Sequence, residues 1–337
     1  MKALAALFLV LFLGAALAQD QSFVIGEIEF FGYSHLKLDR IKAAIPLHEG
    51  DVIAVADIPA GKQKIKESVK RGVGREPTDI AFNCCDNHGN LVIYIGLPGD
   101  SSRSIAHNPR PRGSTRLPQS ILNLYDQAMA LTLEAIQKQP GEDTSRGYGL
   151  SAYPPLRERE LAIREYAITS ELLIRRVLKS SAEAKQRQVA AHALGYARQS
   201  RAQISTLVRA SRDEDDYVRN NAVRALAVLA SSSERVSAWI PPKDFAQMLN
   251  SDTWSDRNKA GRLLVILTRG RNPRLLRVVR LEALDSLVEM ARWRDPSHAS
   301  DARTILGRIA GIEENRLAQI VASGNVDEII DAVRAGK

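Results

Sequence analysis

A short pattern that recurs four times in the C-terminal half of the chain constrains the fold more than any other feature. Each copy carries an alanine followed four residues later by a leucine, and the alanines Ala190, Ala222, Ala260 and Ala302 are 32, 38 and 42 residues apart. A second short helical stretch follows each copy, at 202–210, 245–249, 275–291 and 317–321. Paired helices with a period of about 40 residues are typical of helical solenoids. The sequence therefore predicts a mainly α fold, with an α-solenoid over residues 156–337.

The clearest copy, Val-Arg-x-x-Ala-x-x-Ala-Leu at 218–226, resembles a HEAT repeat. The segments 254–260, 290–293 and 306–311 are also similar to bacterial HEAT-repeat proteins that have no assigned activity. Small alanines let adjacent helices approach, and leucines fill the layer between repeats. The resemblance implies that the repeat arginines brace an acidic residue of a neighbouring turn. The positions with an expected structural role are Arg219, Ala222, Leu226, Arg257, Ala260, Leu264, Ala190, Leu194, Ala302 and Leu306.

Residues 22–98 carry a different pattern, in which short strands and helices follow one another. Alternating apolar residues predict a strand at 23–31, and two more strands are expected at 80–84 and 91–97, joined as a hairpin by the turn at 86–90. Helical spacing predicts helices at 36–45 and 57–70. The order strand–helix–helix–strand–strand indicates a small α+β domain.

This order and three of its segments resemble a POTRA domain. The segments are 28–33 on the first strand, 46–51 between the helices and 90–95 on the closing strand. Domains of this family occur in bacterial envelope proteins that handle other polypeptides, often by pairing an exposed sheet edge with a client strand. The resemblance implies such pairing, since main-chain groups on an edge strand give affinity without a pocket. A transport role is not carried over, because this chain has a single copy. A module that only spaces or anchors the solenoid is the other interpretation.

The first eighteen residues have the pattern of a secretory signal peptide. A positive start at Met1-Lys2 precedes an apolar stretch at 3–17, and small residues stand at Ala16 and Ala18. The apolar stretch is shorter than the roughly 20 residues that span a bilayer. We therefore expect cleavage after Ala18 and a periplasmic or secreted mature protein.

Residues 99–155 are predicted to connect the two domains. The segment 98–118 is rich in Pro, Gly, Ser and Arg and lacks helical periodicity, which predicts a flexible linker. A broad apolar face predicts one amphipathic helix at about 119–139, packed on the first helices of the solenoid. The break at 142–155 has two interpretations, a disordered segment or a docking loop around 147–150.

The two cysteines, Cys84 and Cys85, are adjacent at the end of a predicted strand. Neighbouring side chains of a strand point to opposite faces, so one thiol is expected to point inward and the other outward. A disulfide between neighbours is not expected, because it needs a distorted peptide link. An intermolecular disulfide through the outward thiol is the second interpretation. The cysteines and His88 lack the spacing of zinc ligands, so we expect no metal.

The net charge of +8 lies entirely in the C-terminal half. Residues 1–155 carry 16 basic and 16 acidic residues, whereas 156–337 carry 31 and 23. The candidate partner-binding residues are Arg269, Arg271, Arg274, Arg277 and Arg280. Three of these recur every third residue after Pro273 and would share one side of a helix, whose Leu275, Val278, Val279 and Leu281 are expected to face the core. Guanidinium groups bind carboxylates or phosphates bidentately, and a solvated helix face is the alternative interpretation.

Residues that could support catalysis are scattered. The six histidines are isolated, and His192 and His298 are expected to be structural. The chain has no Gly-x-Ser-x-Gly turn and no glycine-rich phosphate loop. The acidic run 213–216 precedes a predicted helix, where it offsets the helix dipole or, alternatively, binds calcium. We expect no enzymatic activity and no cofactor.

Three functional hypotheses follow. In the first, the chain is a protein-interaction scaffold of the bacterial cell envelope that binds a protein partner through the solenoid and the edge of the N-terminal sheet. In the second, the arginines bind an anionic envelope polymer or membrane surface, and binding would then fall steeply with added salt. The third, an enzyme, rests on HEAT-like solenoids that act on nucleic acid or chromophores, and the leader peptide and the lack of a catalytic constellation argue against it. A nucleic-acid partner is not expected outside the cytoplasm.

Overall fold

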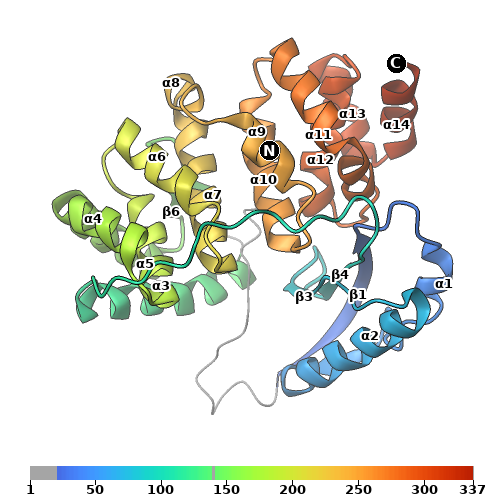
Figure 1. The fold of residues 1–337 in the computed structure, drawn as a ribbon, viewed down its shortest axis with the longest axis horizontal. Helices are drawn as coiled ribbons and strands as arrows, with labels where there is room; N and C mark the ends of the chain where they lie inside the picture. Colours follow the sequence, from blue (N-terminus) through green and yellow to red (C-terminus); the bar gives the residue numbers. More distant parts are fainter. Residues whose placement is uncertain (1–20, 139–140, 337) are drawn as a thin grey trace. The chain divides into compact units, whose positions relative to one another are not determined.

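The computed structural model describes residues 21–138 and 141–336, so the predicted signal peptide lies outside the described residues. Helices dominate these residues, and a small sheet lies near the start of the chain (Figure 1). A mainly α helical-repeat fold preceded by an α+β domain is therefore confirmed. None of the described helices is both long and apolar enough to cross a membrane.

The sheet has four strands, in the order β2-β1-β4-β3. They are β1 (Ser22–Phe31), β2 (Val52–Ala54), β3 (Asp79–Cys84) and β4 (Leu91–Gly96). β1 and β4 are parallel, and the outer strands pair antiparallel to them. The three predicted strands and the hairpin turn are present. β2 was not predicted, because three residues are too few to show alternation.

Helices α1 (Leu38–Lys42) and α2 (Ile58–Val73) cover one face of the sheet (Figure 1). α1 is shorter than the predicted helix at 36–45. α2 has a proline in its first turn and ends at Gly74, whose φ of 77° is the left-handed conformation that favours glycine. The core between these helices and the sheet is built from isoleucines such as Ile65 and Ile93, both with no exposed surface.

A bulge at Gly26 decides which side chains of β1 face which layer. The pairing of β1 with β4 shifts between Ile25 and Glu27. Ile25 and Phe30 therefore belong to the core formed with α1 and α2, while Glu27 and Glu29 point to the opposite face.

The opposite face of the sheet is also buried. Tyr94 on β4 stacks on Trp254 and contacts the edge of Trp293, with ring centroids 4.7 and 4.9 Å apart. The two tryptophans belong to the region of helices α10 (Trp254–Leu267), α11 (Pro273–Ala291) and α12 (Pro296–Ile309). Every residue of β4 is buried as a result.

The remaining helices form the repeats. In chain order they are α3 (Gln119–Lys138), α4 (Pro154–Ser180), α5 (Ala184–Leu194), α6 (Arg201–Ala210), α7 (Asp216–Ser232), α8 (Glu234–Ser237), α9 (Pro242–Met248), α13 (Glu314–Ser323) and α14 (Val326–Ala335). The pattern alanines and leucines lie on α5, α7, α10 and α12, and all eight have no exposed surface. The second helix expected after each copy is present as α6, α9, α11 and α13.

The chain divides into two compact units. One contains residues 106–245 and 262–270, with α3 to α8 and most of α9. The other contains the described residues up to 105 together with 246–261 and 271–336, so the sheet belongs to the same unit as α11 to α14. The two domains expected from the sequence, 22–98 and 156–337, remain a prediction.

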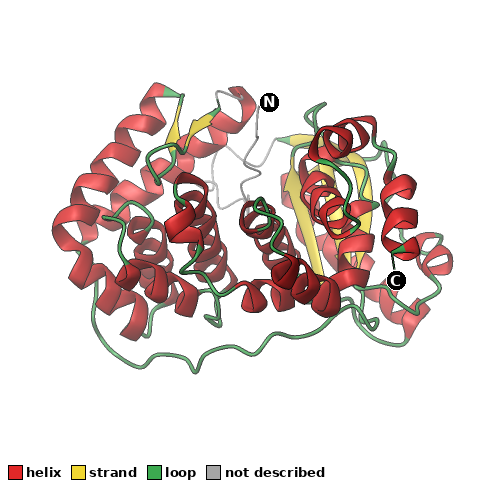
Figure 2. Cartoon of the chain, turned by 90° about the horizontal axis from the view of Figure 1, so that it is seen from above, coloured by secondary structure: helices red, strands yellow, loops and turns green. Residues whose placement is uncertain are grey.

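The prediction of a flexible linker at 98–118 is wrong. The segment has no helix and runs as an extended chain (Figures 1 and 2), but main-chain hydrogen bonds tie it to loops between repeat helices. Its sequence lacks a periodic pattern because main-chain bonding places few demands on side chains.

The segment after α3 is ordered as well. Strands β5 (Glu142–Asp143) and β6 (Leu150–Ser151) form a small hairpin, whose Tyr148 is buried under the guanidinium of Arg164. The interpretation as a disordered segment is therefore wrong. α3 packs on α4, as its apolar face predicted.

Candidate interaction surfaces

Three buried arginines occupy equivalent positions of successive repeats. Arg187, Arg219 and Arg257 each lie three residues before a pattern alanine, and none is more than 3% exposed. Each donates to the main-chain oxygen six residues upstream, at Ser181, Asp213 and Ser251, over 2.9, 2.9 and 2.6 Å. These side chains fix the loop before each helix and are not available to a partner.

Carboxylates balance the buried guanidinium groups of Arg187 and Arg257. Arg187 binds Asp213 bidentately, with both hydrogen bonds at 2.8 Å. Arg257 lies 3.5 Å from Glu289, and burial lowers the pKa of Arg257 to about 10. Bracing by an acidic residue, implied by the HEAT resemblance, is thus present at Arg187 and Arg257.

The acidic run before α7 is used internally. Asp213 holds Arg187, and the Asp215 side chain accepts a hydrogen bond of 3.0 Å from the amide of Val218, which caps the helix. Among the described residues, no group of three or more histidine, cysteine or acidic residues could hold a metal ion.

The five arginines singled out from the sequence do not form one open stripe. Arg271 is paired with Glu314 and donates to the oxygen of Ile312. Arg280 donates to the oxygens of Val333 and Gly336 at the end of α14. Both are therefore used to hold the last helices.

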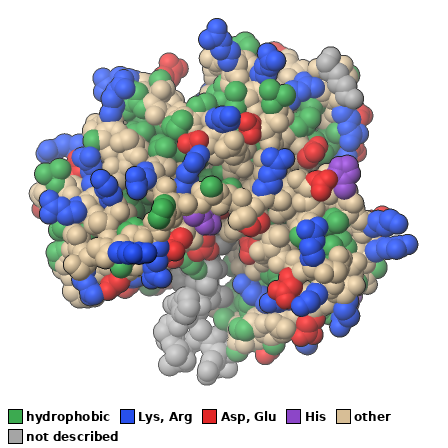
Figure 3. Space-filling model, viewed as in Figure 1, with side chains coloured by type: hydrophobic (Ala, Val, Ile, Leu, Met, Phe, Trp, Pro, Cys, Tyr) green, Lys and Arg blue, Asp and Glu red, His purple; other side chains and the backbone are tan. Residues whose placement is uncertain are grey.

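Arg274 and Arg277 are exposed on α11, as expected for a surface helix side. Arg269 is also exposed but belongs to the other compact unit. Lys and Arg side chains are spread across the whole face shown in Figure 3 rather than gathered at one place.

Leu281 does not face the core, as expected from the sequence, but is 74% exposed. It lies four residues after Arg277, on the exposed side of the helix and ahead of a kink at Ala283. Arg274, Arg277 and Leu281 are therefore exposed on one helix at spacings of three and four residues. We call these three residues the α11 patch.

The edge of β1 beyond β2 is covered by side chains. Trp293 donates from Nε1 to the oxygen of Phe30 at 2.9 Å. Glu289 accepts hydrogen bonds from the amides of Gly32 and Tyr33 at 2.7 and 2.9 Å. A client strand therefore cannot pair with this part of β1, and the edge strands of the sheet are β2 and β3.

A buried polar cluster joins the sheet to α12. The hydroxyl of Tyr94 lies 2.5 Å from Nδ1 of His298, which lies 3.0 Å from a carboxylate oxygen of Asp295. Asn83 lies 3.4 Å from the other ring nitrogen. Burial raises the pKa of Tyr94 well above its usual value. Because these side chains are almost fully buried, the cluster is structural, as predicted for His298.

Acidic side chains of β1 lie close to this cluster. Burial, together with the nearby charges of Glu29 and Asp295, raises the pKa of Glu27 to about 7. Burial likewise raises the pKa of Glu29, although Arg294 hydrogen-bonds its carboxylate at 2.8 Å. Arg294 also binds Glu49, whose pKa it lowers. The guanidinium of Arg294 thus binds two carboxylates, those of Glu29 and Glu49.

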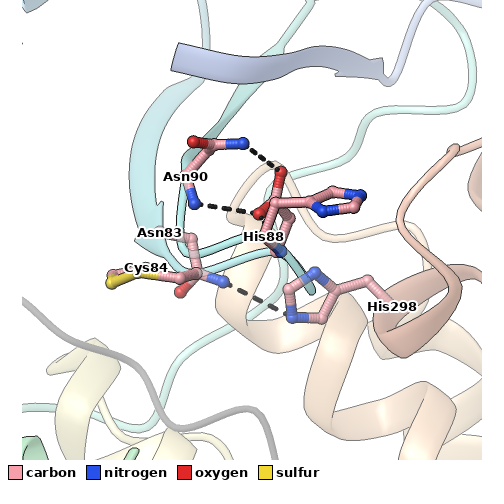
Figure 4. Close-up of a disulfide and its surroundings, with 7 residues drawn as sticks. Asn83, Cys84, His88, Asn90 and His298 are labelled. Carbon is pink, nitrogen blue, oxygen red and sulfur yellow. Dashed lines mark hydrogen bonds between the residues drawn. A yellow bond between two sulfur atoms is a disulfide. The ribbon is translucent and has the colours of Figure 1, made fainter. Parts of the chain in front are cut away.

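Cys84 and Cys85 form a disulfide with each other, across a cis peptide bond, at the end of β3 (Figure 4). The expectation of one inward and one outward thiol is therefore wrong, and so is the second interpretation, an intermolecular disulfide. The turn that follows is stabilised by Asp86, which accepts hydrogen bonds from the amides of His88 and Asn90.

His192 packs between Tyr125 and Tyr196, with ring centroids 5.1 and 5.4 Å away. Burial lowers its pKa to about 3, so the ring is neutral. Its Nε2 has no hydrogen-bond partner among the described residues. The histidine is thus packed among aromatic rings and is not paired with a nucleophile.

Comparisons with known proteins identify no family. No family model matches the chain, and no curated protein matches it. Several solved structures are similar at low identity. They include an engineered protein (15% identity, 64% of this chain and 97% of the other, TM-score 0.39), a computationally designed armadillo repeat protein for modular peptide recognition (15%, 64% and 92%, 0.37) and a designed armadillo repeat protein in complex with the peptide (KR)4 (15%, 63% and 90%, 0.39).

Proposed function

We propose that this chain is a non-enzymatic protein-interaction scaffold of the bacterial cell envelope. Its HEAT-like repeats bind a protein partner through the α11 patch, and its POTRA-like sheet offers the outer edge of β3. The α11 patch supports the proposal most directly, because it sets the exposed side chain of Leu281 beside two arginines whose guanidinium groups are exposed. Arginine is enriched at binding hot spots, and the exposed leucine beside it offers apolar area that a partner can remove from water.

The proposed location is the periplasm or the extracellular space, after cleavage of residues 1–18. This is supported by the sequence pattern of the leader. An internal disulfide is compatible with an oxidising compartment.

Site-specific photo-crosslinking in the native cell tests the partner proposal. Crosslinkers at positions 277 and 281 are expected to capture the same protein. Crosslinkers at Arg40 and Arg71, which are exposed on the two helices of the sheet, serve as controls. Capture from position 277 should be lost when Arg274→Ser and Leu281→Ser are combined. If positions 277 and 281 capture nothing that positions 40 and 71 do not, the α11 patch is not a binding surface.

The second candidate is a binder of anionic envelope polymer or membrane surface. The exposed Arg274 and Arg277 favour it, whereas Arg271, just before α11, and Arg280 on α11 are used internally. Sedimentation of the full chain with vesicles containing phosphatidylglycerol, over a series of salt concentrations, checks it. Binding that falls with salt and is lost in Arg274→Ser/Arg277→Ser, but not in Arg40→Ser/Arg71→Ser, would support this function instead.

A further inference from the structure

The connector between the sheet and α3 is bonded at three points, five residues apart, to the loops that precede repeat helices. Arg103 bonds to Asn250 and Asp252 through main-chain groups, at 2.8 and 3.0 Å. The amide of Asn108 donates to the oxygen of Arg212 at 2.7 Å. Gly113 donates to Ser180 and accepts from Ala182, at 2.7 and 2.8 Å.

The buried repeat arginines fix the conformation of these loops by hydrogen-bonding their main-chain oxygens. Arg187 holds the oxygen of Ser181, so the neighbouring oxygen of Ser180 and amide of Ala182 point outward to Gly113. Arg257 does the same for Ser251, on either side of which Arg103 is bonded. The same loop geometry therefore recurs before α5, α7 and α10 and offers main-chain groups to an extended chain.

Within the unit formed by residues 106–245, charge and close approach add to these bonds. Arg110 lies 3.3 Å from Glu214, and Arg116 pairs with Glu183. A side chain at position 113 would place its Cβ 2.5 Å from the oxygen of Ser180, so only glycine fits there. The amide of Leu117 donates to the buried Gln186 at 2.8 Å.

We propose that the loops preceding α5 and α7 form a docking track for an extended basic segment, and that residues 106–117 are its built-in occupant. The occupant competes with any external segment of the same chemistry, because both would use the same loop oxygens and the same two glutamates. The inference goes beyond the scaffold function, since it assigns a second surface, distinct from the α11 patch. The docking track can therefore be tested without knowing the partner of the α11 patch.

A competition experiment tests the docking track. In the full chain, residues 106–116 are replaced by a Gly/Ser linker of equal length, and a labelled synthetic peptide of residues 106–118 is titrated by fluorescence anisotropy. We expect the peptide to bind the linker variant at least about tenfold more tightly than the unaltered chain. A peptide carrying Gly113→Val should lose this binding. A scrambled peptide of the same composition is the matched control.

Two outcomes would overturn the proposal. One is failure of the peptide to bind a linker variant whose circular dichroism and thermal unfolding match the unaltered chain. The other is equal affinity for both chains, or for the native and scrambled peptides.

Hydrogen exchange on the unaltered chain keeps the test independent of the variant's folding. The amides of Asn108 and Gly113 are expected to exchange much more slowly than the amide of Arg112 between them, because only the first two donate to the loops. Uniformly fast exchange across 106–116, as in an unstructured peptide, would show that the track is empty and the proposal wrong.

Discussion

The carboxylate of Glu289 on α11 accepts a hydrogen bond of 2.7 Å from the main-chain amide of Gly32 at the end of β1. The two residues are 257 positions apart in the chain, and the bond is buried. The same carboxylate accepts from Tyr33 and Ser101 and lies beside the guanidinium of Arg257. One acidic side chain therefore satisfies the end of the sheet, the start of the connector and a repeat arginine at once.

We expect Glu289→Ala to destabilise the fold by roughly 3–5 kcal/mol, because it removes the carboxylate that pairs with the fully buried Arg257. Chemical denaturation followed by circular dichroism measures the change in the free energy of unfolding. The exposed Asp285 on the same helix gives the control, and Asp285→Ala should change that free energy by less than about 0.5 kcal/mol. Equal effects of the two substitutions would contradict the assigned role of Glu289.

The repeat arginines should not tolerate lysine. Arg187→Lys keeps the charge but loses the bidentate contact with Asp213 and the bond to Ser181, so we expect a loss of about 2–3 kcal/mol of stability. Thermal and urea unfolding would measure it. Arg198→Lys, at an exposed position between α5 and α6, is expected to be neutral. A neutral Arg187→Lys would mean that charge alone, without geometry, holds the loop.

The stability of the fold should fall as the pH rises from about 4.5 to about 7, in part because of Glu27. Its pKa is raised from the ordinary 4.5 to about 7 in the folded chain, so the folded state retains a proton that the unfolded state has already released in this range. The shift alone corresponds to about 3 kcal/mol, and solvent screening of the half-buried carboxyl reduces the expected effect to about 1 kcal/mol.

Glu27→Gln removes this titration and should flatten the pH dependence of the unfolding free energy by that amount. Glu76, an exposed residue whose pKa is lowered by Lys66 and Lys70, provides the comparison, because its titration acts at lower pH and in the opposite direction. An unchanged slope between pH 4.5 and 7 in Glu27→Gln would show that this carboxyl ionises freely.

The disulfide between Cys84 and Cys85 predicts that the oxidised chain has no reactive thiol and no disulfide-linked dimer. Mass spectrometry after alkylation should show no added label, and two labels after reduction with a dithiol. Non-reducing electrophoresis should give the monomer alone. Labelling of one thiol without reductant would contradict this pairing.

The repeats were accessible from the sequence because their signal is local. Ala222 and Leu226, and their equivalents in each copy, are buried for the same packing reason each time, so the period itself indicates the fold. Strands β1, β3 and β4 of the sheet were found in the same way, from runs of apolar residues, whereas β2 was missed. The pattern of apolar residues could not show which part of the chain covers the second face of the sheet.

The sequences of β4 and β1 give conflicting indications about whether the second face of the sheet is buried. The run Leu91–Gly96 contains no charged residue, which is typical of a strand covered on both faces, whereas Glu27 and Glu29 on β1 suggested a solvated face. Glu29 can be buried on this face because Arg294, 265 positions away, hydrogen-bonds its carboxylate. A pair so distant in sequence cannot be recognised from local spacing.

The arginines of α11 were only partly predictable. Spacing placed Arg274, Arg277 and Arg280 on one side of a helix, but nothing near Arg280 indicates that the end of α14 would occupy it. The exposure of Leu281, by contrast, follows from its place four residues after Arg277 on the same side of the helix, and it was missed.

The double covering of β4 has a consequence for how the chain is made. During synthesis the four strands emerge early, but Trp254 and Trp293, which close over Tyr94, follow more than 150 residues later. A nascent chain that has only just produced the sheet therefore carries an unprotected aromatic and apolar surface until Trp293 has been synthesised. Ribosome-bound intermediates of this protein should accordingly recruit holding chaperones up to that point and release them once α12 has been completed.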